Sequence, residues 1–178
     1  MSEFGFKQIT PDNWLQPDPI LRGFDGAALD GTAQLINAQD LLPYILGPNL
    51  AHAVPKDIRV LFEVARGSMV YGFLFYPLFT LSVEQLFRIA ETAVTHKCKE
   101  LSAPAEVRSF AQKVDYLFAE AAIPGSERTR WEAIRWMRNK ASHPERQDTV
   151  TPFDAILLLG QMAAIINGLF GGPTTRSS

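Results

Sequence analysis

An arginine and a histidine near the end of a predicted helix are the strongest candidates for a chemical site in this sequence. Arg138 and His143 are five residues apart in the segment Trp131–Glu145. On an unbroken helix, which turns about 100° per residue, their side chains would point about 140° apart. Pro144 disfavours the helical conformation in the residue before it, so the helix is expected to end near Ser142. The chain can then turn His143 back toward Arg138.

Such a pair suits the cleavage of RNA. A histidine that titrates near neutral pH can take the proton from a ribose 2′-hydroxyl. The permanently charged guanidinium of Arg138 can hold the phosphate and stabilise the negative charge that develops on it. The products would be a cyclic phosphate and a 5′-hydroxyl. This chemistry requires neither a metal ion nor a cofactor.

The neighbours of the pair predict a polar strip at the edge of an apolar helix face. Helical spacing puts Trp131, Ile134, Met137 and Ala141 on the apolar side, and Arg135, Arg138, Asn139 and Ser142 on the polar strip. Arg138 is therefore expected at the boundary between core and solvent, where a cleft can form. Residues 127–148 contain six Arg or Lys, Lys140 among them, and four Asp or Glu. This weak positive bias suits RNA, and it equally suits a solvated helix face.

The pattern Arg138-Asn139-x-x-x-His143 resembles the Arg-x4–6-His signature of HEPN domains, in which a polar residue commonly follows the arginine. The place of the motif, at the end of a helix and before a final apolar helix, is also similar to that family. The resemblance covers about residues 56–170. The segment 1–55 lies outside it.

The resemblance implies more than one function. Many HEPN proteins are metal-independent endoribonucleases of toxin–antitoxin or antiviral defence systems, and they dimerise so that two Arg/His pairs form one composite site. By this match Arg138 and His143 are the catalytic pair, and Asn139 is the supporting polar residue. In one toxin subgroup a tyrosine two residues after the histidine is modified by a partner nucleotidyltransferase. Glu145 stands at that position here, which argues against that regulation.

Other HEPN proteins are inactive, and this leaves an alternative open. Arg138 and His143 would also complement the dipole at a helix C-terminus and pair with carboxylates, without any catalytic role. The sequence therefore predicts an HEPN-like protein that cleaves or binds RNA, with an antitoxin or another protein as a candidate partner. The alternative is a non-catalytic module for dimerisation or partner binding.

Two glutamates on an earlier predicted helix are candidates for positioning the arginines. Glu84 and Glu91 share one face of that helix with Arg88, at spacings of four and three residues. They could reach Arg135 or Arg138. Pairing with Arg88 within the helix is the favoured interpretation.

The elements that must position these residues are predicted to be helices from Lys56 onward. Apolar periodicity, capping residues and prolines predict helices from Asp57 to Tyr76, Leu78 to about Leu101, Ser102 to Pro124, Ser126 to about Ser142 and Thr151 to about Phe170. Alternating strand patterns are lacking. We therefore expect an all-α protein, an antiparallel bundle of four to five helices.

The first 55 residues differ in character from the rest. They hold six of the twelve prolines and five of the twelve glycines, yet they are too rich in aromatic and aliphatic residues for a disordered tail. We predict an extended N-terminal arm over residues 1–55, with one short helix near Asn37–Leu46, that packs on the helical body or on a partner chain. The bundle is expected over residues 56–172 and a flexible tail over 173–178.

Composition limits the location and the general class. The net charge of −2 gives no whole-molecule case for nucleic-acid binding, so an RNA site must be a local patch. A single cysteine, Cys98, fits a reducing cytosol, and with His96 nearby but no second ligand pair it predicts no metal site. The apolar stretches 69–81 and 155–170 fall short of the ~20 residues that span a bilayer. A cytoplasmic protein without a membrane segment is expected.

The apolar run Met69–Leu81 predicts a homodimer. It is apolar on all sides and has too many large residues for one side of a single helix pair: Met69, Val70, Phe73, Leu74, Phe75, Leu78 and Phe79. A contiguous apolar patch usually marks an interface, and two-fold symmetry is the commonest closed arrangement.

Overall fold

The computed structural model describes residues 5–23, 25–27, 33–35, 38–141 and 150–171. This part of the chain contains six α-helices: α1 (Ala38–Leu46), α2 (Lys56–Tyr71), α3 (Pro77–Glu100), α4 (Phe110–Ala119), α5 (Arg128–Ala141) and α6 (Pro152–Phe170). Two short 3-10 helices, η1 (Pro19–Gly23) and η2 (Gly125–Glu127), precede β1 and α5. The prediction of an all-α bundle is confirmed.

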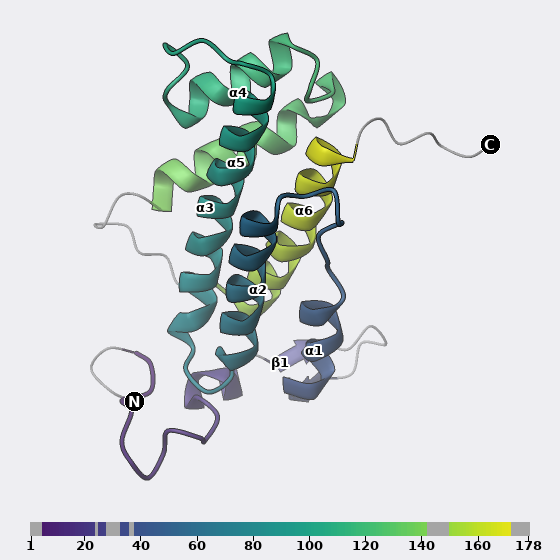
Figure 1. Ribbon diagram of the computed structural model, residues 1–178. Coiled ribbons are helices and arrows are strands. Elements are labelled where there is room, and N and C mark those ends of the chain that lie inside the picture. The colour runs from purple at the N-terminus through teal and green to yellow at the C-terminus, as the bar shows by residue number, and fades with distance from the viewer. Residues whose placement is uncertain (1–4, 24, 28–32, 36–37, 142–149, 172–178) are drawn as a thin grey trace, which may run out of the picture.

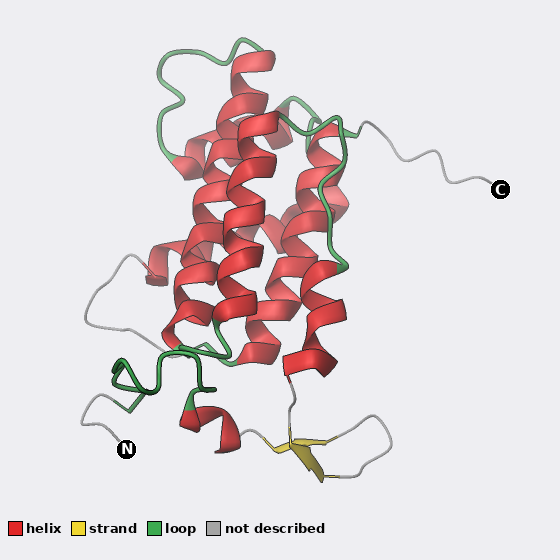
Figure 2. Ribbon diagram, turned by 60° about the horizontal axis from the view of Figure 1, so that its bottom comes forward, coloured by secondary structure: helices red, strands yellow, loops and turns green. Residues whose placement is uncertain are grey.

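A two-stranded hairpin is the one β element in the described residues. Strands β1 (Asp25–Ala27) and β2 (Ala33–Leu35) pair antiparallel, with Asp25 opposite Leu35. Figure 2 shows the hairpin beyond the start of α1, outside the helical bundle. The hairpin therefore lies outside the bundle, and the helices pack against one another through their own apolar side chains.

Helix α3 is the central element of the bundle. It packs against α2, α4, α5 and α6, and Figure 1 shows it running through the length of the molecule beside α2. Ten of its 24 residues are buried: Phe79, Ser82, Val83, Leu86, Phe87, Ile89, Ala90, Ala93, Val94 and Cys98. These residues occupy several sides of the helix, and a helix of that kind needs neighbours on each of them.

Helix α6 begins where the sequence predicts. The side chain of Thr151 accepts a hydrogen bond from the backbone N–H of Asp154 at 3.1 Å, and Pro152 takes the first helical position. Length and composition alone would let α6 cross a membrane: it has 19 residues and a mean hydropathy of 1.7. The length argument against a membrane segment was therefore wrong for α6. Core helices share this composition, and α6 buries nine residues, with Leu159, Met162 and Ile166 fully covered.

The break between α2 and α3 comes five residues earlier than predicted. Helix α2 ends at Tyr71, and Gly72 to Tyr76 form a turn before Pro77 starts α3. A Cβ at Gly72 would lie 2.7 Å from the ring of Phe79, so a side chain there would collide with the core. The close approach of the two helices at this turn requires glycine.

The third predicted helix starts later than expected. Ser102 does not cap it, since Ser102 has a left-handed backbone (φ 55°) in the connection after α3. Ser109 is the cap: its side chain accepts from Gln112 N, and the Gln112 side chain accepts from Ser109 N. Such a reciprocal pair provides hydrogen-bond acceptors for the backbone N–H groups at the helix start. It sets the start of the helix, although Pro104 favoured an earlier one. The apolar stripe of this helix then buries Phe110, Val114 and Leu117.

The single chain covers most of the apolar run that predicted a dimer, but it leaves Tyr71 and Leu81 61% and 51% exposed. Met69, Phe73 and Phe79 are buried, and the other four large residues of the run are half-buried. The turn at Gly72–Tyr76 folds the run back on itself, so its side chains face two packed helices instead of one. The seven large residues named for the run therefore no longer argue for a homodimer, and the homodimer stays a prediction.

The N-terminal arm docks on the turn between α2 and α3. The buried Asp18 carboxylate accepts hydrogen bonds from Lys7 N at 3.3 Å and from Tyr76 N at 2.9 Å, and Asp18 N donates to Phe73 O at 2.8 Å. The arm covers less apolar surface than its composition suggests, because Trp14 is 57% exposed. It contributes this polar contact together with the buried side chains of Leu21, Leu41 and Ile45.

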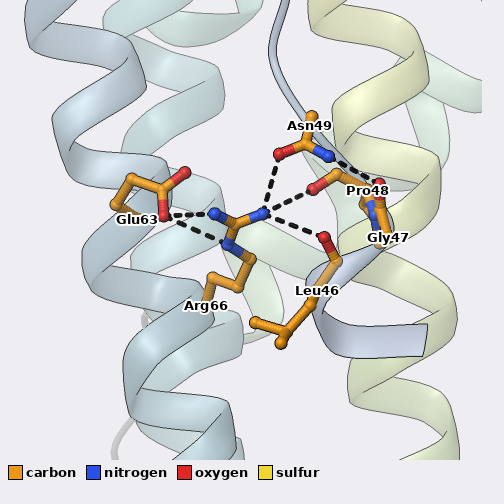
Figure 3. Close-up of polar contacts among 6 residues, drawn as sticks. All are labelled: Leu46, Gly47, Pro48, Asn49, Glu63 and Arg66. Carbon is orange, nitrogen blue, oxygen red and sulfur yellow. Dashed lines mark hydrogen bonds and ion pairs between the residues drawn. The ribbon is translucent and has the colours of Figure 1, made fainter. Parts of the chain in front are cut away.

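Helix α1 is joined to α2 by the side chain of Arg66. Its guanidinium donates to Leu46 O and Pro48 O, both at 3.1 Å, to Asn49 Oδ1 at 2.8 Å, and to Glu63 on its own helix (Figure 3). Leu46 is the last residue of α1, whose terminal carbonyls lack partners within the helix. Arg66 therefore closes the end of α1 and fixes the connection to α2.

Replacing Arg66 with methionine should lower the free energy of unfolding by about 1–3 kcal/mol, since several hydrogen bonds from one charged group are lost. Urea denaturation followed by circular dichroism measures the change. The matched control is Arg88→Met on the exposed surface of α3, expected to change stability by less than about 0.5 kcal/mol. Equal losses in the two variants would contradict this role of Arg66.

Candidate functional site

The predicted site residues divide between two helices and one segment outside the described residues. Helix α5 carries four of them: Arg135, Arg138, Asn139 and Lys140. Helix α3 carries Glu84 and Glu91. Ser142 and His143 lie outside the described residues. The described part of the site therefore consists of residues from α3, α5 and α6.

Arg138 forms an ion pair across two helices with Glu91. Its Nη2 lies 3.1 Å from Glu91 Oε2, and the two side chains are 35% and 40% exposed. The favoured interpretation, in which Glu91 pairs with Arg88, was wrong. Helix α5 packs on α3, and this brings residues 47 positions apart into contact. Glu91 thus holds the guanidinium at the boundary between core and solvent that the helical spacing predicted.

A pocket of about 280 Å³ lies beside this ion pair. Its walls are Glu84, Phe87, Arg88, Glu91, Arg138 and Ala141. Two carboxylates, two guanidinium groups and the aromatic ring of Phe87 thus surround a small cavity. Ala141 precedes His143 by only two residues in the sequence, so the predicted catalytic pair begins on the wall of this pocket.

A larger pocket of about 420 Å³ adjoins the first between α3, α5 and α6. The two share Glu84, Phe87 and Ala141, and the larger one adds Thr80, Val83, Trp136, Met137, Lys140, Val150, Asp154, Leu157, Leu158 and Gln161. Trp136 is 64% exposed, and Lys140 Nζ lies 5.5 Å from the centre of its ring. The sequence reasoning missed this pocket. The available signal was a tryptophan on the polar side of α5.

Two predicted supporting residues stand apart from both pockets. The guanidinium of Arg135 lies 3.9 Å from Asp115 of α4, and Asn139 is exposed. Neither lines either pocket. The structure therefore brings together Arg138, Glu91 and Glu84, with Lys140 in the adjoining pocket, and leaves Arg135 and Asn139 outside.

The chain that follows the motif is fixed at Val150. Tyr76 Oη donates to Val150 O at 3.0 Å, and Val150 N donates to Thr80 Oγ1 at 3.3 Å. Burial, and then the charges of Asp154 and Asp18, raise the pKa of the Tyr76 phenol. The hydroxyl therefore keeps its proton and remains a donor. Both ends of the motif region are thus attached to α3, through Arg138 before it and Val150 after it.

Other titratable groups form no metal site within the described ranges, where no three His, Cys, Asp or Glu residues gather. His96 Nε2 lies 2.7 Å from Asp57 Oδ2 and joins α3 to α2. Burial raises the pKa of Cys98, so this thiol stays protonated at neutral pH.

Comparison with known proteins gave one match. A family model described as "Domain of unknown function (DUF4145)" matches residues 79–176, more than half of the chain. No curated protein and no solved structure matched significantly. The matched region runs from the third residue of α3 through α6, and so contains both pockets and the Arg138–His143 pair. The arm, α1 and α2 precede it.

The variant Tyr76→Phe should loosen the chain at Val150. Loss of the phenol leaves Val150 O without that donor, and the free energy of unfolding should fall by about 1 kcal/mol. Hydrogen exchange at the Val150 amide should become faster. Tyr116→Phe is the matched control, because Tyr116 Oη donates to Leu101 O at 3.2 Å, elsewhere in the bundle. Faster Val150 exchange in both variants, or in neither, would contradict the specific attachment.

Proposed function

This chain belongs to the DUF4145 family, whose description names no activity, and from its own site we propose an HEPN-like, metal-independent endoribonuclease. The observation that carries the proposal is the position of Arg138. Glu91 holds its guanidinium on the wall of a pocket, five residues before His143. The setting that fits such an activity is bacterial defence or a toxin–antitoxin system in the cytoplasm, with cellular or phage RNA as substrate and an antitoxin as candidate partner.

In the proposed reaction, His143 takes the proton of a ribose 2′-hydroxyl as the 2′ oxygen attacks the neighbouring phosphorus. The bond from phosphorus to the 5′ oxygen breaks, and the leaving oxygen takes up a proton. The products are a 2′,3′-cyclic phosphate and a 5′-hydroxyl. Arg138 stabilises the charge on the phosphoryl oxygens.

Glu91 would orient the guanidinium in this reaction. A guanidinium carries five N–H donors in a fixed plane, so one group can serve a carboxylate and a phosphate together. The Glu91 carboxylate fixes the plane of the Arg138 guanidinium before RNA binds. The Arg138 side chain then loses less conformational freedom on binding. Lys140 adds positive charge on the same helix.

A non-catalytic module for partner binding is the second candidate. Large apolar side chains are exposed on the three helices that form the larger pocket, with Leu81, Trp136, Phe153 and Leu157 each 47–64% exposed; Trp136 and Leu157 line the pocket itself. Exposed apolar patches commonly mark binding surfaces. This function predicts partner binding that does not depend on Arg138 or His143.

The variants Arg138→Ala and His143→Ala should each abolish cleavage of single-stranded RNA and leave the helical circular-dichroism spectrum unchanged. Arg130→Ala is a control on the same helix, where Arg130 pairs with Glu127 at 3.1 Å and lines neither pocket of the site. It should cleave at the wild-type rate. EDTA should have no effect, and mass spectrometry should identify a cyclic phosphate. Loss of activity in EDTA would overturn the mechanism, and an inactive wild type would favour the module.

We also propose a homodimer, now through a strip on α2 that shares only Tyr71 with the run 69–81. Val60, Val64 and Tyr71 lie along α2 and are 53%, 56% and 61% exposed, an apolar strip that no other described element covers. Light scattering should give a mass near twice 19.8 kDa, and Val64→Glu should reduce it to one chain. The control Glu63→Gln changes an exposed neighbour and should remain dimeric. A wild-type mass of one chain would rule out the dimer.

A further inference from the structure

The two glutamates that line the adjoining pockets differ in their partners. Glu91 is bound to Arg138, whereas Glu84 makes no hydrogen bond or ion pair within the part of the chain that the structure describes. Glu84 is half-buried and lies in the wall that both pockets share. A partly desolvated carboxylate at such a place is available to accept hydrogen bonds from a ligand in the larger pocket.

The larger pocket suits a flat aromatic ligand. Val83, Phe87, Met137 and Leu158 provide apolar walls, and its volume of about 420 Å³ falls within the range of small-molecule sites. The exposed ring of Trp136 offers a stacking surface of the kind that proteins use for single-stranded bases. Lys140 contributes a positive charge at the same pocket, which favours a ligand attached to phosphate.

The carboxylate of Glu84 selects among the bases. An ionised carboxylate only accepts hydrogen bonds. Guanine presents two adjacent donors, N1–H and the 2-amino group, on its Watson–Crick edge, and both can meet the two carboxylate oxygens. Adenine places an acceptor beside its amino group, and cytosine does likewise. Uracil has one N–H between two carbonyl oxygens. Guanine is therefore the base whose edge best matches Glu84.

We propose that the larger pocket binds a guanine base of single-stranded RNA, with Glu84 accepting from N1–H and the 2-amino group and Trp136 stacking on the ring. The neighbouring phosphate then lies at Arg138, and this second part rests on the proposed ribonuclease function. The shared wall of the pockets makes the two contacts contiguous. The site would thus direct cleavage to bonds beside guanine.

Binding of mononucleotides tests the pocket without any need for cleavage. Isothermal titration of the full chain with guanosine 3′-monophosphate and adenosine 3′-monophosphate should show about tenfold tighter binding of the guanosine nucleotide, the discrimination typical of a bidentate contact. Glu84→Gln should remove this preference, because the amide presents a donor to a donor edge. Trp136→Ala should weaken both nucleotides alike. Glu100→Gln, at the far end of α3, is the matched control and should keep the wild-type preference.

The outcomes distinguish a failure of the proposed guanine pocket from a failure of the proposed nuclease. Equal binding of the two nucleotides, or a guanine preference that survives Glu84→Gln, would overturn the assignment even if the protein cleaves RNA. Binding of neither nucleotide would overturn it as well and would favour a protein side chain as occupant. A guanine preference without RNA cleavage would support the pocket and overturn only the nuclease. Since the side chain of Trp136 is exposed, Trp136→Ala still tests the pocket if a Glu84 variant fails to fold: unchanged binding of both nucleotides in this variant would overturn the stacking contact.

Discussion

Burial of α3 along its length is the constraint on which the rest of the structure depends. Its apolar residues occupy several sides, so the helix is stable only when α2, α4, α5 and α6 all pack against it. The bundle follows from that requirement, and so does the site. A charged residue on α3 can remain only where the covering helices leave a gap, whereas the buried hydroxyl of Ser82 donates to Leu78 O of its own helix. Glu84 and Glu91 occupy such a gap, opposite α5.

The turn between α2 and α3 connects distant parts of the chain. Asp18 of the arm binds Tyr76 through its backbone N–H, and the Tyr76 hydroxyl binds the carbonyl of Val150. One residue thus links the N-terminal arm to the end of the connection that carries His143. The described residues on either side of 142–149 are both attached to α3, through Arg138 and Val150. The arm is therefore connected through Tyr76 to Val150, although it lies outside the matched family region.

The electrostatics of the site come from two carboxylates on one helix with different partners. Glu91 meets the guanidinium of Arg138, and Glu84 faces the larger pocket. In the proposed ribonuclease a carboxylate beside the phosphate would repel the substrate unless a cation neutralised it, and Arg138 would neutralise Glu91 in this way. A carboxylate in an apolar pocket instead favours ligands with donor groups. The same residue type can thus serve positioning in one pocket and recognition in the next.

Local rules in the sequence determined the helical class and most helix ends. Thr151 with Pro152 sets the start of α6, and Pro77 sets the start of α3, because caps and prolines act through neighbouring backbone atoms. The start of α4 was missed because two cap signals seven residues apart, Ser102 and Ser109, competed, and the reciprocal pair of Ser109 and Gln112 prevailed. The sequence by itself also determined that Arg138 stands at the edge of an apolar face. Only the tertiary structure decided that Glu91 reaches Arg138, that Arg135 turns to Asp115, and that Trp136 borders a pocket. These contacts join residues of different helices, and side-chain spacing along one helix carries no information about how another helix packs across it.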